Sequence, residues 1–212
     1  MKELFKNKFR VAPTRLKNWN YSQPGYYFIT ICIQGRRCCF GEVRNGIMGL
    51  TNEGLIAHEF WAEITKHFEN INIDKFVVMP NHVQGILQIL NMDNIPDDNE
   101  FGSKIGDLHY DRRDAIYRVS TTSFADMDAP TNWDKNKFGP LRPNSLSLIV
   151  GCYKSAVTRY CNQNGLAEFD WQERFYDRII RDEEELANVR KYIHDNPANW
   201  WKDRNNPNSN KS

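Results

Sequence analysis

The chain has 212 residues, of which 40% are hydrophobic and 26% are charged. This composition is close to the globular average and excludes a disordered, collagen-like or supercharged chain. The length favours one domain with an elaboration over two domains. The N-terminal residues lack an apolar stretch, and no run of about 18 apolar residues occurs, so we expect neither secretion nor a membrane span, and a cytoplasmic location. The five cysteines lack C-x-x-C spacing, which favours reduced thiols over disulfides or a zinc site.

Charge is distributed unevenly along the chain. The formal net charge is only +1, so the overall balance does not indicate a nucleic-acid-binding protein. The segment 1–18, however, contains six Lys and Arg residues and one Glu. Such a segment can lie along phosphates, and a solvated tail explains the charge equally well.

The apolar patterns of the first half predict strands and one helix. Aromatic and β-branched residues at 26–33 follow a Pro-Gly turn and predict a central strand. Shorter runs at 39–43 and 47–50 flank Asn-Gly, which is typical of a hairpin. From Thr51, which suits an N-cap, apolar residues follow helical spacing to about residue 69.

The second half begins with two apolar runs, 71–79 and 82–90, which flank Pro-Asn and predict an antiparallel hairpin. Residues 91–144 show no sustained period and are interpreted as a long insertion. Beyond it we expect a helix, a strand, a helix and a polar, frayed tail, at 145–164, 171–180, 182–196 and 202–212.

The order strand, helix, strand, strand, helix, strand, helix is that of a ferredoxin-like α+β sandwich. In the predicted arrangement, helices cover one face of an antiparallel sheet and the other face is open. We therefore expect a single domain over 1–212, with the insertion 91–144 decorating it.

His82 and Gln84 are the first candidate site residues. They stand at i and i+2 on a predicted strand, so both side chains project from the same face, while Val83 points into the core. An imidazole and an amide oxygen can both bind a divalent cation without repelling a phosphate. The alternative is that they are two polar residues on a solvated strand face.

Tyr192 and Asn196 lie on one flank of the predicted helix 182–196, one turn apart. A phenol is a credible nucleophile toward phosphorus, and the amide could complete a metal site with His82 and Gln84. The alternative interpretation makes Tyr192 a half-buried edge of the core and Asn196 a helix C-cap.

Five segments, taken in order, resemble the single-tyrosine HUH transposases, and more closely the REP-associated tyrosine transposases. The segments are RLK…YSQPG (15–25), VVMPNHVQ (77–84), YKSAVT (153–158), WQ…FYD (171–177) and YIHDNP (192–197). The resemblance covers nearly the whole chain except 91–144.

The resemblance implies a ferredoxin-like HUH endonuclease that takes part in DNA transposition or recombination on single-stranded or hairpin DNA. Tyr192 would attack the scissile phosphate, forming a 5′-phosphotyrosine link and a free 3′-OH. Mg²⁺ or Mn²⁺ would be held by His82, Gln84 and Asn196, and the protein could act as a homodimer.

The sequence departs from the family at Gln84, where the usual motif has a second histidine. A similar His-x-Gln motif occurs in related rolling-circle replication initiators of small viruses. Two hypotheses therefore remain: an active strand-transferase, and a catalytically silent, domesticated protein that binds DNA hairpins. A third, an RNA-binding ferredoxin-like domain, has less support because the strands lack the required aromatic run.

Six basic residues are candidate DNA contacts: Arg15, Lys17, Arg36, Arg37, Lys154 and Arg159. Trp200 and Trp201 suit either base stacking or a packing lid. His194 is interpreted as a surface or packing residue.

Overall fold

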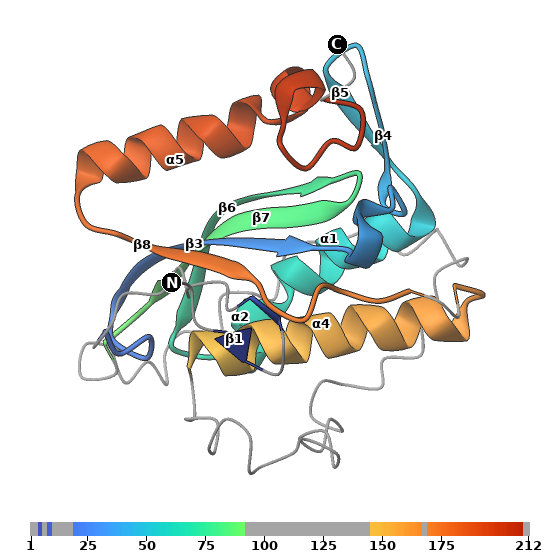
Figure 1. The fold of residues 1–212 in the computed structure, drawn as a ribbon. Helices are drawn as coiled ribbons and strands as arrows, with labels where there is room; N and C mark the ends of the chain where they lie inside the picture. The colour runs from blue at the N-terminus through green and yellow to red at the C-terminus, as the bar shows by residue number, and fades with distance from the viewer. Residues whose placement is uncertain (1–3, 6–7, 10–18, 92–144, 167–168, 210–212) are drawn as a thin grey trace, which may run out of the picture.

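The computed structural model describes residues 4–5, 8–9, 19–91, 145–166 and 169–209 (Figure 1). The predicted insertion from residue 92 to 144 lies outside the described residues. So do Arg15 and Lys17 of the basic N-terminal segment, whose proposed DNA contacts therefore stay predictions.

The core of the fold is a four-stranded antiparallel sheet. Its strands lie in the order β6-β7-β3-β8, and every neighbouring pair is antiparallel. They span β3 (Gly25–Cys32), β6 (Ile71–Met79), β7 (His82–Ile89) and β8 (Tyr176–Ile180). This order is the one a ferredoxin-like connection produces, and the predicted α+β class is confirmed.

Helices cover both faces of the sheet (Figure 1). On one face α1 (Asn52–Ala62), α2 (Ile64–His67) and α4 (Leu146–Gln163) enclose the larger core. On the other lies α5 (Glu183–Asp195), whose Leu186 and Ile193 form a second core with apolar residues of three strands. The predicted open face is therefore wrong, because the apolar stripe of α5 needs a partner and the sheet supplies it.

Side-chain caps explain where the helices begin. Thr51 Oγ1 accepts from Gly54 N, Ser145 Oγ from Leu148 N, and Asp182 Oδ1 from Glu185 N at 2.7 Å. Each bond satisfies a backbone N–H that the first helical turn leaves without a partner. After Asn196 the chain continues as the 3₁₀ helix η5 (Pro197–Lys202), because proline cannot continue the α-helical hydrogen bonds.

A separate hairpin follows the central strand. After the short 3₁₀ helix η1 (Gln34–Arg36), β4 (Gly41–Arg44) pairs with β5 (Ile47–Leu50). Its turn residues Asn45 and Gly46 have positive φ angles of 52° and 76°, as the Asn-Gly prediction requires. At the N-terminus, β1 (Leu4–Phe5) pairs with β2 (Lys8–Phe9).

Strand β7 alternates between the two cores. Val83 and Leu87 belong to the core under α1 and α4, whereas Ile86 belongs to the core under α5. Gly85 faces Trp61 so closely that a Cβ would lie 2.5 Å from the indole ring, so only glycine fits. This alternation puts His82 and Gln84 on the α5 face.

The predicted strand 171–180 is shorter in the structure, beginning at Tyr176, and Trp171 forms only an isolated bridge with Ile33. All five cysteines are free thiols. Within the described ranges, no helix is long and apolar enough to cross a bilayer.

Candidate active site

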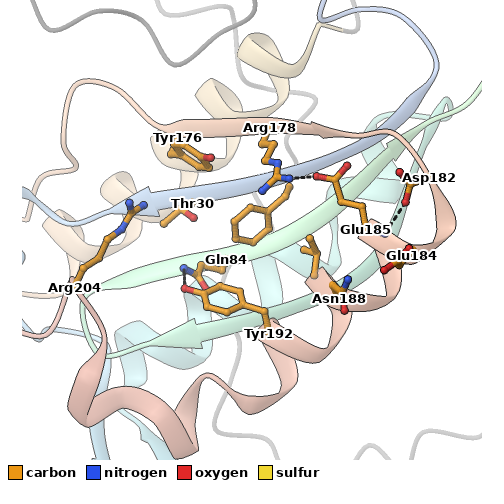
Figure 2. Close-up of a pocket in the computed structure, with 12 residues that line it drawn as sticks. Thr30, Gln84, Tyr176, Arg178, Asp182, Glu184, Glu185, Asn188, Tyr192 and Arg204 are labelled. Carbon is orange, nitrogen blue, oxygen red and sulfur yellow. Dashed lines mark hydrogen bonds and ion pairs between the residues drawn. The ribbon is translucent and has the colours of Figure 1, made fainter.

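Three of the predicted site residues meet through hydrogen bonds. Gln84 Nε2, on β7, donates to the Tyr192 hydroxyl of α5 over 3.3 Å (Figure 2). Asn196 Nδ2, at the end of α5, donates to Gln84 Oε1. Residues more than 100 positions apart therefore form one polar network beneath the helix.

The ring of Tyr192 packs against the protein, and the residue is also accessible from solvent. Its ring packs edge-to-face on Phe28, with centroids 6.0 Å apart, and 48% of the residue is exposed. It lines a cleft of about 630 Å³ between α5 and the sheet. The phenol can therefore meet a large substrate without a change of fold.

Tyr153, in contrast, is unsuited to a nucleophilic role. It is fully buried, its hydroxyl donates to the Ala57 carbonyl over 2.9 Å, and burial raises the pKa of its phenol well above the usual value. Among these two tyrosines only Tyr192 is accessible to a phosphodiester.

The side chain of Asn81 determines which nitrogen of His82 carries the proton. Asn81 Nδ2 donates to the carbonyls of Arg36 and Asn205, over 3.1 and 2.8 Å. Its Oδ1 is therefore an acceptor, and it lies 2.9 Å from His82 Nδ1. Hence Nδ1 carries the hydrogen, which we assign from this network, and Nε2 carries the lone pair.

His82 Nε2 is buried and has no hydrogen-bond partner among the described residues. Burial lowers the pKa of this imidazole to about 3, and the positive charge of Arg204 acts in the same direction. His82 is therefore neutral at physiological pH. A neutral imidazole whose other nitrogen is tied to a second residue is the usual form of a metal-binding histidine.

The residues present fit a single divalent cation. His82 offers a nitrogen to which no described residue bonds, and Gln84 and Asn196, both buried, offer amide oxygens. The part of the chain that the structure describes holds no cluster of three or more His, Cys, Asp or Glu, so any cation here would have neutral ligands. The alternative of a solvated face is wrong for His82 and Gln84, because both are buried.

The remaining predicted DNA contacts lie in two places. Arg36 and Arg37 are exposed in the loop after β3, near the C-terminal segment, where Arg36 Nη1 donates to the Arg204 carbonyl over 3.0 Å. Lys154 and Arg159 lie on α4, which covers the opposite face of the sheet from α5. Lys154 Nζ donates to the Gln172 carbonyl over 2.8 Å, so its charge also holds the segment before β8.

Sequence reasoning missed residues that line the cleft. Thr30, Tyr176, Arg178 and Arg204 all border it beside Tyr192. The alternation of β3 with β7 could have indicated Thr30, since it pairs in register with Gln84.

Residues 202–209, the described part of the predicted tail, are not frayed. Asp203 and Asn205 are buried, and the Asn205 carbonyl accepts a hydrogen bond from Asn81. Polar composition predicted a loose end here, but these side chains and carbonyls find partners inside the protein. Trp200 also packs near His82, with ring centroids 5.9 Å apart, whereas Trp201 is 71% exposed.

No protein-family model matches the chain. An uncharacterized protein of Haemophilus influenzae is 30% identical over 190 residues, which cover 90% of this chain and 89% of that protein. The two proteins belong to one family. The region of similarity includes nearly the full length of both chains, so the relative carries the same domain.

The comparison with solved structures finds two transposases of low sequence identity. One is a REP-associated tyrosine transposase bound to a REP hairpin, with a TM-score of 0.49 and 17% identity over 87% of this chain and 73% of that chain. The other is a candidate transposase of Deinococcus radiodurans R1, with a TM-score of 0.41 and 11% identity over 85% and 96% of the two chains.

Proposed function

We propose that the protein is a DNA strand-transferase of the transposase type, in which Tyr192 attacks a phosphodiester of single-stranded or hairpin DNA. The observation that supports this most is the accessible Tyr192 phenol bound to Gln84, on the strand face that also carries the unpartnered nitrogen of His82. Tyr192 and Gln84 line the open cleft, and Gln84 connects the nucleophile to the candidate cation site, whose other residues, His82 and Asn196, are buried behind it.

The reaction exchanges one phosphodiester for another. Tyr192 Oη forms a bond to phosphorus while the bond from phosphorus to the 3′-oxygen breaks. The phenol proton goes to solvent, and the departing 3′-oxygen takes up a proton to become a free hydroxyl. Because the phosphotyrosine diester keeps the bond energy, a 3′-hydroxyl of another strand can reverse the step without an external energy source.

The chain's own residues orient the phenol. Phe28 limits rotation of the Tyr192 ring, and the Gln84 amide N–H stabilises negative charge that develops on the hydroxyl oxygen. Asn196 in turn holds the Gln84 amide in place. Mg²⁺ or Mn²⁺, held by His82, Gln84 and Asn196, would polarise the phosphate.

One observation favours the catalytically silent alternative. The Gln84 oxygen, which stands where the family motif has an imidazole nitrogen, already accepts a hydrogen bond from Asn196. If that bond persists when DNA is bound, the cation loses a ligand, and the protein binds hairpins without cutting them.

The substitution Tyr192→Phe tests the proposal. It removes the phenol oxygen and keeps the packing against Phe28, so we expect unchanged DNA binding and complete loss of the covalent adduct. The assay incubates each protein with a pool of single-stranded DNA hairpins and Mn²⁺ and separates the products on denaturing gels.

Tyr160→Phe is the matched control, because Tyr160 lies on α4, on the opposite face of the sheet. It should form the adduct at the wild-type rate. If Tyr192→Phe still formed the covalent adduct, the nucleophile would be another residue. If the wild-type protein formed no adduct at any metal concentration, the catalytically silent alternative would be favoured.

A further inference from the structure

The cleft beside Tyr192 has a negative end and a positive end. Asp182, the N-cap of α5, and Glu184, in the first turn of that helix, border one end, and Arg204 borders the other (Figure 2). Arg178 also borders it, but its guanidinium forms an ion pair with Glu185. A polyanion therefore enters most favourably at the Arg204 end, where no carboxylate of the described residues pairs with the positive charge.

Thr30 offers a buried hydroxyl at that end. It lies on β3 directly opposite Gln84, is 2% exposed, and its Oγ1 has no hydrogen-bond partner among the described residues. A buried hydroxyl without a partner destabilises the folded protein, because it has lost its hydrogen bonds to water. The core packing does not require this hydroxyl, since valine has the same shape, so the hydroxyl itself points to a ligand.

Arg204 carries a positive charge that lies at the cleft and has no carboxylate partner among the described residues. Its guanidinium lies 5.6 Å from the centre of the Tyr176 ring, and the described residues give it no carboxylate partner. Its backbone is fixed, because its carbonyl accepts from Arg36 and its neighbours Asp203 and Asn205 are buried. With its backbone fixed, Arg204 loses less conformational entropy when it binds an anion than it would in a loose tail.

We propose that Arg204 and Thr30 form a phosphate-binding subsite beside Tyr192, in which both side chains donate hydrogen bonds to non-bridging oxygens of a DNA phosphate. The inference deepens the proposed function and rests on it for the identity of that phosphate as the diester attacked by the phenol. Guanidinium groups bind phosphate oxygens in pairs, and the hydroxyl supplies a further donor from the floor of the cleft.

Inorganic phosphate tests the subsite without requiring catalysis. The side-chain amide signals of Gln84, assigned by NMR, report on the floor of the cleft during a phosphate titration at constant ionic strength. We expect a saturable shift in wild type, roughly 10-fold weaker binding in Arg204→Met, and wild-type binding in Lys202→Met. Lys202 is the matched control, since it lies in the same segment with its ammonium over Trp201, away from the cleft lining.

Thr30→Val and Thr30→Ser separate the hydroxyl from the packing. Valine keeps the shape and should weaken phosphate binding roughly 3-fold, whereas serine should restore the affinity. No saturable shift in wild type, or equal affinities for Arg204→Met and Lys202→Met, would overturn the subsite. So would undiminished binding by Thr30→Val.

DNA then shows whether this phosphate is the one attacked. With single-stranded hairpins that wild type links covalently, Arg204→Met should slow adduct formation at saturating DNA, and Lys202→Met should not. If phosphate binds through Arg204 but wild type forms no adduct, the proposed function fails and the anion subsite stands. If the adduct forms equally fast in Arg204→Met, the proposed function stands and the assignment of the subsite is wrong.

Discussion

The side chain at position 84 determines what kind of cation the site can hold. An amide oxygen is a harder and weaker donor than an imidazole nitrogen, so Gln84 favours Mg²⁺ or Mn²⁺ over later transition ions. In the structure the same side chain also binds Tyr192 and Asn196. One residue therefore couples the nucleophile to the candidate cation site.

Replacement of Gln84 by histidine should tighten binding of Mn²⁺, Co²⁺ or Ni²⁺ about 10-fold, because a nitrogen ligand replaces an oxygen ligand. Gln84→Ala should weaken metal binding and slow adduct formation while DNA binding persists. Calorimetric titration of the DNA-free proteins with Mn²⁺ measures the affinities.

Gln88→His is the control for this series. Gln88 lies on the same strand and the same face as Gln84 but bonds to Asn72, away from Tyr192. Its histidine variant should bind Mn²⁺ no more tightly than wild type. Equal affinities in all these proteins would remove position 84 from the ligand set.

Sequence spacing proposed the central residues of the candidate site, and the family resemblance favoured them, but neither pointed to the residues at its periphery. His82 and Gln84 follow from strand alternation, and Tyr192 and Asn196 from one helical turn, because these relations are local. Thr30 and Arg204 depend on the pairing of β3 with β7 and on the path of the chain after η5. Local patterns carry no information on such long-range placement.

At the scale of elements, α5 is tied to the edge of the sheet by a charged pair. Arg190 Nε donates to both carboxylate oxygens of Asp74, over 2.8 and 3.2 Å. Asp74 lies where the pairing of β6 with β7 is interrupted, between Ile73 and Phe76. The irregular strand thus provides an anchor two residues before Tyr192.

Loss of this pair should loosen the helix that carries the nucleophile. We expect Asp74→Asn and Arg190→Met each to lower the free energy of unfolding, with a coupling energy of about 1 kcal/mol in a double-mutant cycle. Adduct formation should slow roughly 10-fold through poorer positioning of the phenol. Chemical denaturation and single-turnover rates provide the two measurements.

The exposed pair Lys66–Glu63, on α2 and its N-cap, is the control. Glu63→Gln should leave the rate of adduct formation unchanged. It should alter the free energy of unfolding by no more than about 0.5 kcal/mol. If Asp74→Asn formed the adduct as fast as Glu63→Gln, the positioning of α5 would not depend on the pair of Asp74 and Arg190.

Most helices and strands could be predicted from the sequence, because helix caps, turns and apolar periodicity depend on residues close together in the chain. Examples are the caps Thr51 and Asp182 and the turn at Asn45-Gly46. Which face of the sheet α5 covers could not be predicted. The stripe of Leu186 and Ile193 shows that the helix packs on something, but not on which side. Both faces of the central strands are apolar enough to accept a helix, and the chain connection decides between them.

At the scale of the whole molecule, segments from across the chain meet at one end of the sheet. Asn81 joins the loop after β3 to the C-terminal segment, and α5 adds Tyr192 and Asn196. The hydrogen bonds that join Tyr192, Gln84 and Asn196 therefore form within a single chain. The proposed site does not need a second copy to supply the tyrosine.

The charge of the N-terminal segment predicts how DNA affinity depends on salt. Lys2, Lys6 and Lys8 would each release about 0.7 counterion on contact with a single strand. Deletion of residues 1–8 should therefore flatten the slope of log affinity against log salt by about two units. Fluorescence anisotropy with a labelled hairpin, from low to moderate salt, measures both slopes, and an unchanged slope would make the segment a solvated tail.

The central claim is that Tyr192 becomes covalently joined to DNA. The most direct measurement is peptide mass spectrometry of the protein–DNA adduct, formed with single-stranded hairpins and Mn²⁺ and digested with nuclease and protease. The account predicts a nucleotide attached through a 5′-phosphate to the peptide that contains Tyr192, and to no other tyrosine peptide. A nucleotide on a different residue, or strand cleavage without any protein-linked nucleotide, would contradict it.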